Sequence, residues 1–334
     1  MLTTFLFAFI LAFGISLFFA PIYIRFARRI KLGQNILHYV ESHYSKQGTP
    51  TMGGVIFIVG TILGTIIFLD GSSSLALMTI GVTTLYGLLG FLDDFLKIKK
   101  RDNLGLKARH KLLGQCVLSL FVAFFVYSFS PIGSYIFIPF MAQPVNIGFF
   151  VFPLTILVFV ATTNSINLTD GLDGLASRTT QICLLAFLAM LIVLSNSFGF
   201  NITQLTELHN LMLVIIATVG ALFAFGLFNS FPAKIFMGDA GSLALGALVS
   251  CVAVFTGLSL FLLFFGFLFV LSSLSVMLQV LYFKKTKGKR IFLMAPLHHH
   301  FEKKGIHENR IVSIYSIIGI IISSIVVVAH YFIY

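Results

Sequence analysis

The sequence contains few charged residues and few cysteines. Only 10% of its 334 residues are Asp, Glu, Lys or Arg, and 58% are hydrophobic, whereas a soluble globular domain carries about 25% charged residues. This composition excludes a soluble protein. The three cysteines fall within apolar stretches, and their spacing suggests neither a disulfide framework nor a metal site. Tryptophan is absent, and the 39 phenylalanines are expected to pack inside the protein or to face lipid.

Long apolar runs take up most of the chain. A helix needs about 20 predominantly apolar residues to cross a hydrocarbon core of roughly 30 Å. Ten stretches fit this requirement, and no soluble domain, linker or obvious repeat separates them. They are approximately 2–24, 52–69, 75–92, 112–129, 147–163, 179–198, 211–228, 240–257, 258–283 and 311–333. The sequence therefore predicts an all-α integral membrane protein with ten transmembrane helices, organised as a single polytopic domain over residues 1–334.

Charge is divided unequally between the two sets of connecting loops. All 22 lysines and arginines, and nine of the eleven carboxylates, fall in one set, whereas the other set contains no lysine or arginine. Because basic loops remain in the cytoplasm, both termini are predicted to be external. The net charge of +11 then reflects topology and attraction to anionic lipid rather than binding of nucleic acid. The uncharged external stretch 130–148 is expected to form a short hairpin or an interfacial element.

The first of five polar motifs closes the third predicted span. Asp93 and Asp94 are adjacent there, and Lys97 returns to the helix face of Asp94 three residues later. Ionisable groups at the end of a membrane helix are costly unless they have a task. We therefore interpret this pair as part of a cytoplasmic active site, with a hydrated helix end as the alternative.

The second motif follows the fifth predicted span. It contains Asn164, Asn167, Asp170 and Asp173 within a segment that is also rich in glycine. Such a composition opposes continued helix and suits a turn whose amides and side chains face a ligand. A plain connecting loop would explain the glycines but would not need this regular spacing of polar residues.

The third motif opens the eighth predicted span. Asn229 and Phe236 precede Gly238 and Asp239, and small residues follow. Asp239 is a natural N-cap, which is the alternative interpretation. However, Gly238 and its small neighbours clear side chains from a helix N-terminus, where phosphate groups bind well. The motif therefore predicts that Asp239 holds a divalent cation beside those phosphates.

The fourth and fifth motifs lie in the last cytoplasmic loop and before the second span. The fourth contains three consecutive histidines, His298, His299 and His300. Adjacent histidines cannot easily all turn to one tetrahedral zinc ion, so we expect hydrogen bonds or ion pairs with phosphate instead. The fifth, beginning at Lys46, is a turn and helix start beside a cation.

Together and in this order, the five motifs resemble those of the bacterial phospho-N-acetylmuramoyl-pentapeptide transferase family. This family belongs to the polyprenyl-phosphate N-acetylhexosamine-1-phosphate transferases, and the resemblance covers essentially the whole chain. It implies ten transmembrane helices in the bacterial cytoplasmic (inner) membrane, a cytoplasmic active site, a homodimer and a requirement for Mg²⁺. The implied reaction transfers phospho-N-acetylmuramoyl-pentapeptide from UDP-MurNAc-pentapeptide to undecaprenyl phosphate, which yields lipid I and UMP.

The resemblance also assigns roles to individual residues. Asp239 is the implied magnesium ligand. The implied catalytic residues are Asp93, Asp94, Lys97, Lys111, Asp239, His298, His299 and His300. The implied pocket residues, which bind substrate or cofactor, are Lys46, Asn164, Asn167, Asp170, Asp173, Asn229, Phe236 and Gly238.

Alternatives remain open for both the mechanism and the substrate. A phosphate monoester has a second pKa near roughly 6, so the lipid phosphate is largely dianionic at neutral pH. This favours direct attack, aided by Asp93 or Asp94, over a covalent aspartyl-phosphate intermediate, but the sequence does not decide between them. A sibling transferase for UDP-N-acetylglucosamine would share the aspartates and is disfavoured by segments 49–54 and 296–302. A secondary transporter would place its polar groups nearer the membrane midplane.

Overall fold

The computed structural model describes residues 2–30, 32, 48–71, 73–100 and 105–333. Helices dominate this part of the chain, joined by one short hairpin and two 3-10 turns. The elements are α1 (Leu2–Arg29), α2 (Gly54–Ile66), α3 (Ser74–Lys100), α4 (Ala108–Phe129), β1 (Tyr135–Ile136), β2 (Val145–Asn146), η2 (Gly148–Phe150), α5 (Val151–Thr169), α6 (Leu175–Ser197), α7 (Ile202–Asn229), α8 (Gly238–Phe255), η3 (Ser259–Phe261), α9 (Leu262–Phe265), α10 (Phe267–Lys285), α11 (Leu297–Lys303) and α12 (Glu308–Tyr331).

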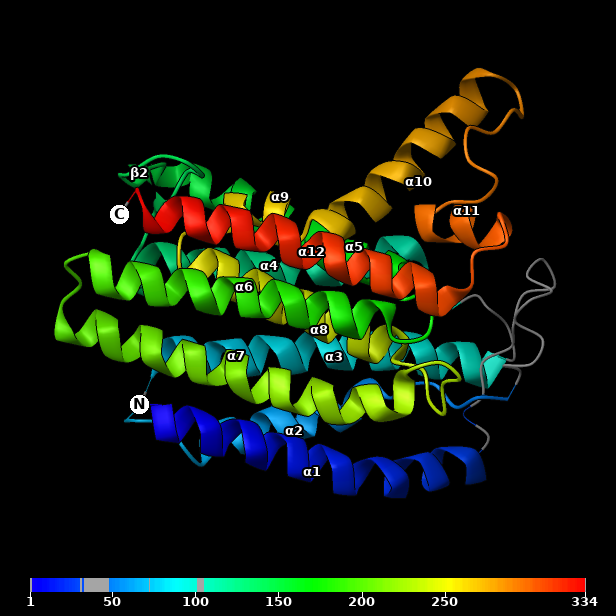
Figure 1. Cartoon of the computed structure of the whole chain (residues 1–334), viewed down its shortest axis with the longest axis horizontal. Coiled ribbons are helices and arrows are strands. Elements are labelled where there is room, and N and C mark those ends of the chain that lie inside the picture. Colours follow the sequence, from blue (N-terminus) through cyan, green and yellow to red (C-terminus); the bar gives the residue numbers. More distant parts are fainter. Residues whose placement is uncertain (1, 31, 33–47, 72, 101–104, 334) are drawn as a thin grey trace.

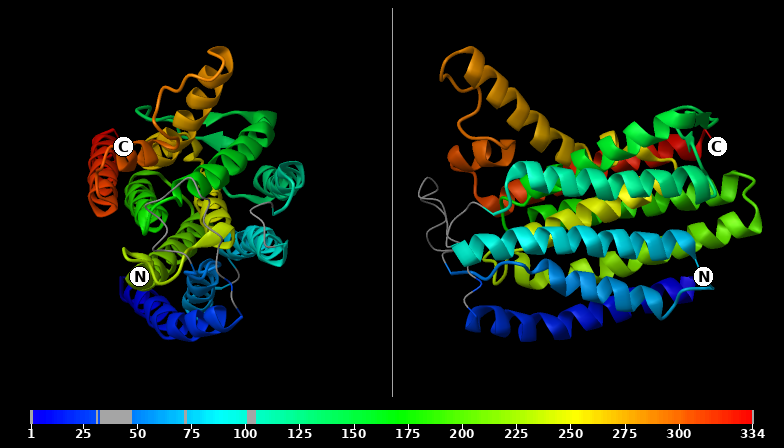
Figure 2. Two further views of the ribbon diagram at one scale, coloured as in Figure 1. Left: turned by 90° about the vertical axis from the view of Figure 1, so that its right-hand side faces the viewer. Right: turned by 180° about the vertical axis from the view of Figure 1, so that it is seen from behind.

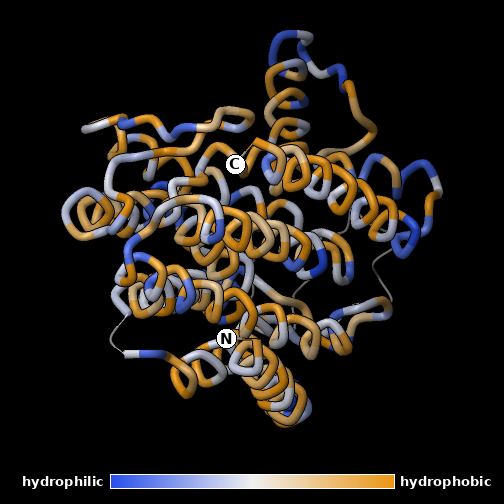
Figure 3. Tube along the Cα trace, turned by 60° about the vertical axis from the view of Figure 1, so that its left-hand side comes forward, coloured by the Kyte–Doolittle hydropathy of each residue, from blue (hydrophilic) through white to orange (hydrophobic). Residues whose placement is uncertain are grey.

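The long helices form a bundle whose axes run side by side (Figure 1). Nine helices within the described residues are long and apolar enough to cross a membrane. Apolar residues cover their lengths, whereas hydrophilic residues gather toward helix ends and loops (Figure 3). This confirms the prediction of an all-α multi-pass membrane protein. Both chain termini lie at one end of the bundle, and the C-terminal ends of α1 and α3 lie at the other (Figure 1).

Helix α2 is shorter than the predicted span 52–69. Its 13 residues measure about 20 Å, which is less than the roughly 30 Å of a hydrocarbon core. The preceding residues 50–53 run as a non-helical segment, and this segment and the first residue of α2 pair with residues 236–237. The pairing uses hydrogen bonds from Phe236 N to Pro50 O (2.8 Å), from Gly53 N to Phe236 O (2.9 Å) and from Gly54 N to Met237 O (3.0 Å). We call this pairing the clasp. It satisfies backbone groups that lipid cannot satisfy.

The predicted span 258–283 is interrupted in the structure. The chain forms η3 and the single turn α9, and α10 begins only after Gly266. Helix α10 then leaves the bundle at an angle, and α11 folds back beneath its tip (Figures 1 and 2). Hydropathy could not reveal this break because apolar residues continue through it. At the opposite end, β1 and β2 pair as an antiparallel hairpin, as expected for the stretch 130–148.

Helix α8 lies at the centre of the bundle, between α3 and α5, and nearly all of its residues are buried. Glycines at the crossings let the helix axes approach closely. A Cβ atom at Gly90 of α3 would collide with the backbone of Asp239, and one at Gly246 would collide with Thr163 of α5. A Cβ atom at Gly54 would meet Gly241. These contacts fix the start of α8 against α2 and α3.

Candidate active site

Three aspartates meet where α3 and α8 cross. Asp93 and Asp94 lie in the last two turns of α3 and are only 3% and 4% exposed. Asp239 is the second residue of α8. Asp94 Oδ2 accepts a hydrogen bond from Ala240 N at 3.1 Å, and Asp93 Oδ1 accepts one from Leu106 N at 2.6 Å. Motifs separated by about 140 residues in the sequence therefore form one acidic cluster.

Two lysines neutralise most of this cluster. Lys97 Nζ lies 2.9 Å from Asp239 Oδ2 and 2.9 Å from Asp93 Oδ2. Lys111, in the first turn of α4, lies 2.6 Å from Asp239 Oδ2 and 3.4 Å from Asp93 Oδ2. Charges this far from water are tolerated only when they are paired. The three carboxylates and two ammonium groups form a compact network, in which Asp239 Oδ2 contacts the ammonium groups of both lysines.

The asparagines of the second motif have different surroundings. Asn167 Nδ2 donates to Asp239 Oδ1 at 2.7 Å and to Ser242 Oγ at 2.8 Å, so Asn167 belongs to the network. Asn164, one turn earlier, instead donates to Gln115 Oε1 at 2.8 Å and to Val160 O. Sequence reasoning missed Gln115, although its position four residues after Lys111 places it on the same face of α4.

The aspartates of the second motif also differ from each other. Burial and the negative charges of Asp239 and Asp94 raise the pKa of Asp170 well above its usual range, and a hydrogen bond from Gly238 N opposes this shift. Asp173 Oδ2 instead accepts a hydrogen bond from Ala233 N at 2.9 Å. Asp170 thus faces the acidic cluster, whereas Asp173 contacts the loop that precedes α8.

Two residues of the third motif shape this loop. Asn229 is buried, and its side-chain amide donates to Ile235 O at 3.0 Å. Phe236 contributes its backbone to the clasp. Gly238 has a φ of 72°, a conformation that favours glycine, and a Cβ atom there would crowd Asp94 Oδ2 and Thr51 Oγ1. The glycine therefore allows α8 to begin directly beside Asp94.

The three histidines lie on the short helix α11 and point to different partners. His298 is fully buried, and neither ring nitrogen has a hydrogen-bond partner among the residues that the structure describes. Burial, followed by the neighbouring His299, lowers the pKa of His298 to about 3. Burial therefore favours the uncharged ring of His298 at neutral pH. His299 Nδ1 lies 2.8 Å from Glu302 Oε2, and His300 Nδ1 accepts from Leu293 N at 3.1 Å.

Helix α11 packs against the second motif through Gly171. A Cβ atom at this position would collide with the Nε2 atoms of both His298 and His299. The fold thus brings the first two histidines to the Asp170 loop, whereas His300 secures the segment before α11. The remaining candidate, Lys46, lies outside the described residues.

The donor groups suit a magnesium ion better than zinc. Among the described residues, no group of three His, Cys, Asp or Glu side chains is arranged to hold a metal ion by itself. Mg²⁺ commonly takes one or two carboxylates and completes its shell with water and substrate phosphates. Asp239 Oδ2 already contacts two ammonium groups, and their combined charge equals that of one divalent cation. Asp239 therefore fits a magnesium ligand in charge and in donor type.

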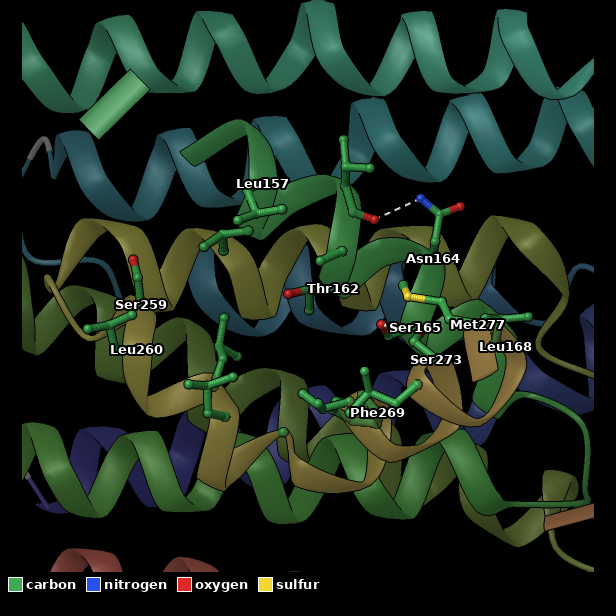
Figure 4. A pocket seen from close by; sticks show the side chains of 18 of the residues that line it. Leu157, Thr162, Asn164, Ser165, Leu168, Ser259, Leu260, Phe269, Ser273 and Met277 are labelled. Carbon is green, nitrogen blue, oxygen red and sulfur yellow. Dashed lines mark hydrogen bonds between the residues drawn. The ribbon is translucent and has the colours of Figure 1, made fainter. Parts of the chain in front are cut away.

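An apolar cavity of about 620 Å³ lies between α5, η3, α9 and α10. Figure 4 shows the side chains that line it, most of them apolar. Its polar groups include Asn164 and the hydroxyls of Ser165 and Ser273, which share a hydrogen bond of 2.6 Å. Asn164 lies one helical turn before Asn167, which bonds to Asp239. The break before α10, which hydropathy did not reveal, creates this space.

The bundle and its charged network define a polytopic membrane protein of the transferase class, and the comparisons agree. Residues 76–257 match glycosyl transferase family 4, and residues 46–58 match phospho-N-acetylmuramoyl-pentapeptide-transferase signature 1. The enzyme of that name from Clostridium botulinum (strain Eklund 17B) is 42% identical over 96% of this chain and 94% of its own length. The enzyme from Clostridium novyi is 41% identical over 94% of this chain and 93% of its own length. The enzyme from Thermoanaerobacter sp. (strain X514) is 40% identical over 96% of this chain and 97% of its own length. The chain belongs to the phospho-N-acetylmuramoyl-pentapeptide-transferase family.

Proposed function

We propose that this protein transfers phospho-N-acetylmuramoyl-pentapeptide from UDP-MurNAc-pentapeptide to undecaprenyl phosphate, forming lipid I and UMP in peptidoglycan synthesis. The network of Asp239, Lys97 and Lys111 carries this proposal. Phosphoryl transfer between a diphosphate and a lipid phosphate brings anions together, so its catalysis depends on positioning and charge neutralisation. A carboxylate with two ammonium groups at 2.6 and 2.9 Å supplies both.

In this proposal, Asp239 would hold Mg²⁺, which would supply charge neutralisation for the diphosphate. The ammonium groups of Lys97 and Lys111, which lie against Asp239, would contact the phosphate oxygens. Asn167 fixes the other oxygen of Asp239 and so keeps the carboxylate oriented. These residues supply the electrostatic stabilisation that phosphoryl transfer requires.

The carboxylates of α3 have separate roles. Asp93 has Oδ1 occupied by Leu106 N and Oδ2 by the two lysines. Asp94 Oδ2 accepts a hydrogen bond from Ala240 N, whereas Asp94 Oδ1 lies 3.5 Å from Lys97 Nζ, a longer distance than either contact of that lysine with Asp93 or Asp239. Asp94 Oδ1 is therefore the better placed oxygen to accept a residual proton from the lipid phosphate or to orient it. Attack by the lipid phosphate then needs no covalent enzyme intermediate.

The apolar cavity is suited to the polyprenyl chain. It is lined almost entirely by carbon atoms, and Asn164 marks its polar end near the network. A lipid tail lying against α5 and α10 would bring its phosphate toward Asn167. In the same arrangement, the Asp170 loop, Asp173, Asn229 and Phe236 form the walls of the nucleotide-sugar pocket, with the histidines of α11 closing it.

The placement in the membrane follows from the same features. We propose that nine apolar helices within the described residues, and α2 together with the segments on either side of it, make ten crossings in one polytopic domain over residues 1–334. An even number of crossings agrees with both termini lying at one end of the bundle (Figure 1). The basic loops place the opposite end in the cytoplasm. From the family resemblance we also propose the bacterial inner membrane, a homodimeric state and a magnesium requirement.

One assay tests the activity. Purified protein is mixed with undecaprenyl phosphate, Mg²⁺ and either UDP-MurNAc-pentapeptide or UDP-N-acetylglucosamine, and UMP release is measured. We expect UMP with the first sugar nucleotide and little with the second. Equal turnover of both would assign the protein to the sibling transferases, and no turnover of either would refute the proposed function.

A further inference from the structure

A buried tyrosine of α1 holds the clasp. Tyr23 is 9% exposed, and its hydroxyl donates to Met52 O at 3.0 Å. Met52 is fully buried and has a φ of 65°. Residues other than glycine, asparagine and aspartate rarely adopt this left-handed conformation. Such a backbone conformation persists only when its surroundings enforce it. The hydrogen bond from the Tyr23 hydroxyl to Met52 O helps to hold Met52 in this conformation.

The strained residue is directly connected to the start of α8. The two residues after Met52 donate their amides to Phe236 O and Met237 O, at 2.9 and 3.0 Å. Phe236 and Met237 immediately precede Gly238 and Asp239. Any rotation of the peptide after Met52 therefore shifts the partners that fix where α8 begins.

A second contact joins Met52 to the carboxylates. A Cβ atom on Gly238 would lie 3.0 Å from Met52 N and 2.8 Å from Thr51 Oγ1, and it would also crowd Asp94 Oδ2. Gly238 is thus enclosed by the 51–52 backbone on one side and by Asp94 on the other. Because the space is full, a movement of Met52 is transmitted to Gly238 rather than absorbed.

We infer that Tyr23 is a positioning residue for the reaction: through Met52 and the clasp it sets the distance between Asp239 and the carboxylates of α3. The inference rests on the proposed function for its kinetic consequence. The Tyr23 hydroxyl donates to the backbone at Met52 rather than to a carboxylate, and Tyr23 comes from a helix on which the sequence shows no active-site motif. Its ring packs against Phe19 with centroids 5.9 Å apart, so Tyr23→Phe keeps the packing and removes one hydrogen bond.

The test compares Tyr23→Phe with Tyr315→Phe in the full-length purified protein. Tyr315 is a matched control because it is also buried, while its hydroxyl has no hydrogen-bond partner within the described residues. We expect Tyr23→Phe to lower kcat about tenfold or more, since a displacement of about 1 Å can cost about 100-fold. KM for both substrates should stay within about twofold of wild type, because the binding surfaces are not altered. Tyr315→Phe should leave kcat unchanged.

Hydrogen exchange measured by mass spectrometry provides a readout that does not depend on turnover. In Tyr23→Phe, peptides that contain the clasp amides of Gly53, Gly54 and Phe236 should exchange faster than in wild type, while the thermal midpoint stays nearly constant. Unchanged exchange in those peptides, or a kcat within about twofold of wild type, would refute the positioning role. If the wild-type protein releases no UMP, the proposed function fails while the exchange experiment still decides whether Tyr23 holds the clasp.

Discussion

Replacing Asp239 by asparagine tests the centre of the network. The substitution preserves side-chain shape and most N-cap capacity, but it removes the charge that attracts Lys97, Lys111 and a divalent cation. The neutral amide also places an N–H group, or at best an uncharged oxygen, where Oδ2 now accepts two ammonium groups at 2.6 and 2.9 Å. Losing one preorganised charge-stabilising group typically costs about 100- to 1,000-fold in kcat. Here several such contacts depend on one oxygen, so we expect kcat to fall by about 1,000-fold or more.

The effect on stability should be smaller. Hydrogen bonds to charged groups contribute about 1.5 to 3 kcal/mol each, but both lysines keep contacts with Asp93, at 2.9 and 3.4 Å. The variant should therefore fold and show only a modest decrease in its thermal midpoint. UMP release across a range of Mg²⁺ concentrations measures the catalytic loss, and raising Mg²⁺ should restore little of it.

A matched control uses the other end of the bundle. Asp70 is exposed, and its backbone N and O atoms, not its carboxylate, bond to the side chain of Asn210. Asp70→Asn removes the same charge and should leave turnover unchanged. If Asp239→Asn kept near-normal activity at ordinary Mg²⁺, Asp239 would be only a helix cap, and the assignment of a magnesium ligand would be wrong.

Three further predictions concern orientation, the histidines and helix packing. A cysteine placed near Lys287 should resist membrane-impermeant labelling of intact cells while one near Asn201 reacts, and the reverse pattern would overturn the orientation. His298→Ala should lower kcat/KM by about 100-fold. A zinc chelator should not change the activity of the wild-type protein. Because the pKa of His298 is lowered to about 3, the ring stays neutral above that pH, and the pH–rate profile between about pH 5 and 8 should contain no step that this substitution removes. Gly90→Ala should lower activity and cost about 1 to 3 kcal/mol of stability, because its Cβ collides with the start of α8, whereas Gly81→Ala on the same helix meets open space and should do neither.

The sequence allowed the membrane class and the main charged residues to be predicted for clear physical reasons. Apolar length determines whether a helix can cross the bilayer, and this criterion places most helices correctly. Asp93, Asp94 and Asp239 could be selected because isolated carboxylates at membrane helix ends need an explanation. Their convergence, together with Lys97 and Lys111, required the structure, because it depends on the crossing of α3 and α8.

Other features could not be inferred from residue type. The hydropathy of residues 52 and 53 is as compatible with a helix as that of the α2 residues that follow them, so the predicted span began before α2 does. Polar type alone does not show whether a side chain faces a ligand or a backbone. Asn167 bonds to the carboxylate of Asp239, whereas Asn229 bonds to a backbone oxygen, Ile235 O, in the loop between α7 and α8. Tyr23 gave no signal at all because it acts through a carbonyl group far along the chain.

The shortness of α2 gives the start of α8 a polar neighbour inside the bundle. Since α2 falls on the order of 10 Å short of the hydrocarbon thickness and begins against Gly241, the backbone of residues 50–53, rather than a further helical turn, faces the loop before α8. A longer α2 would satisfy those backbone groups within itself, and the start of α8 would lose the partners that now fix it.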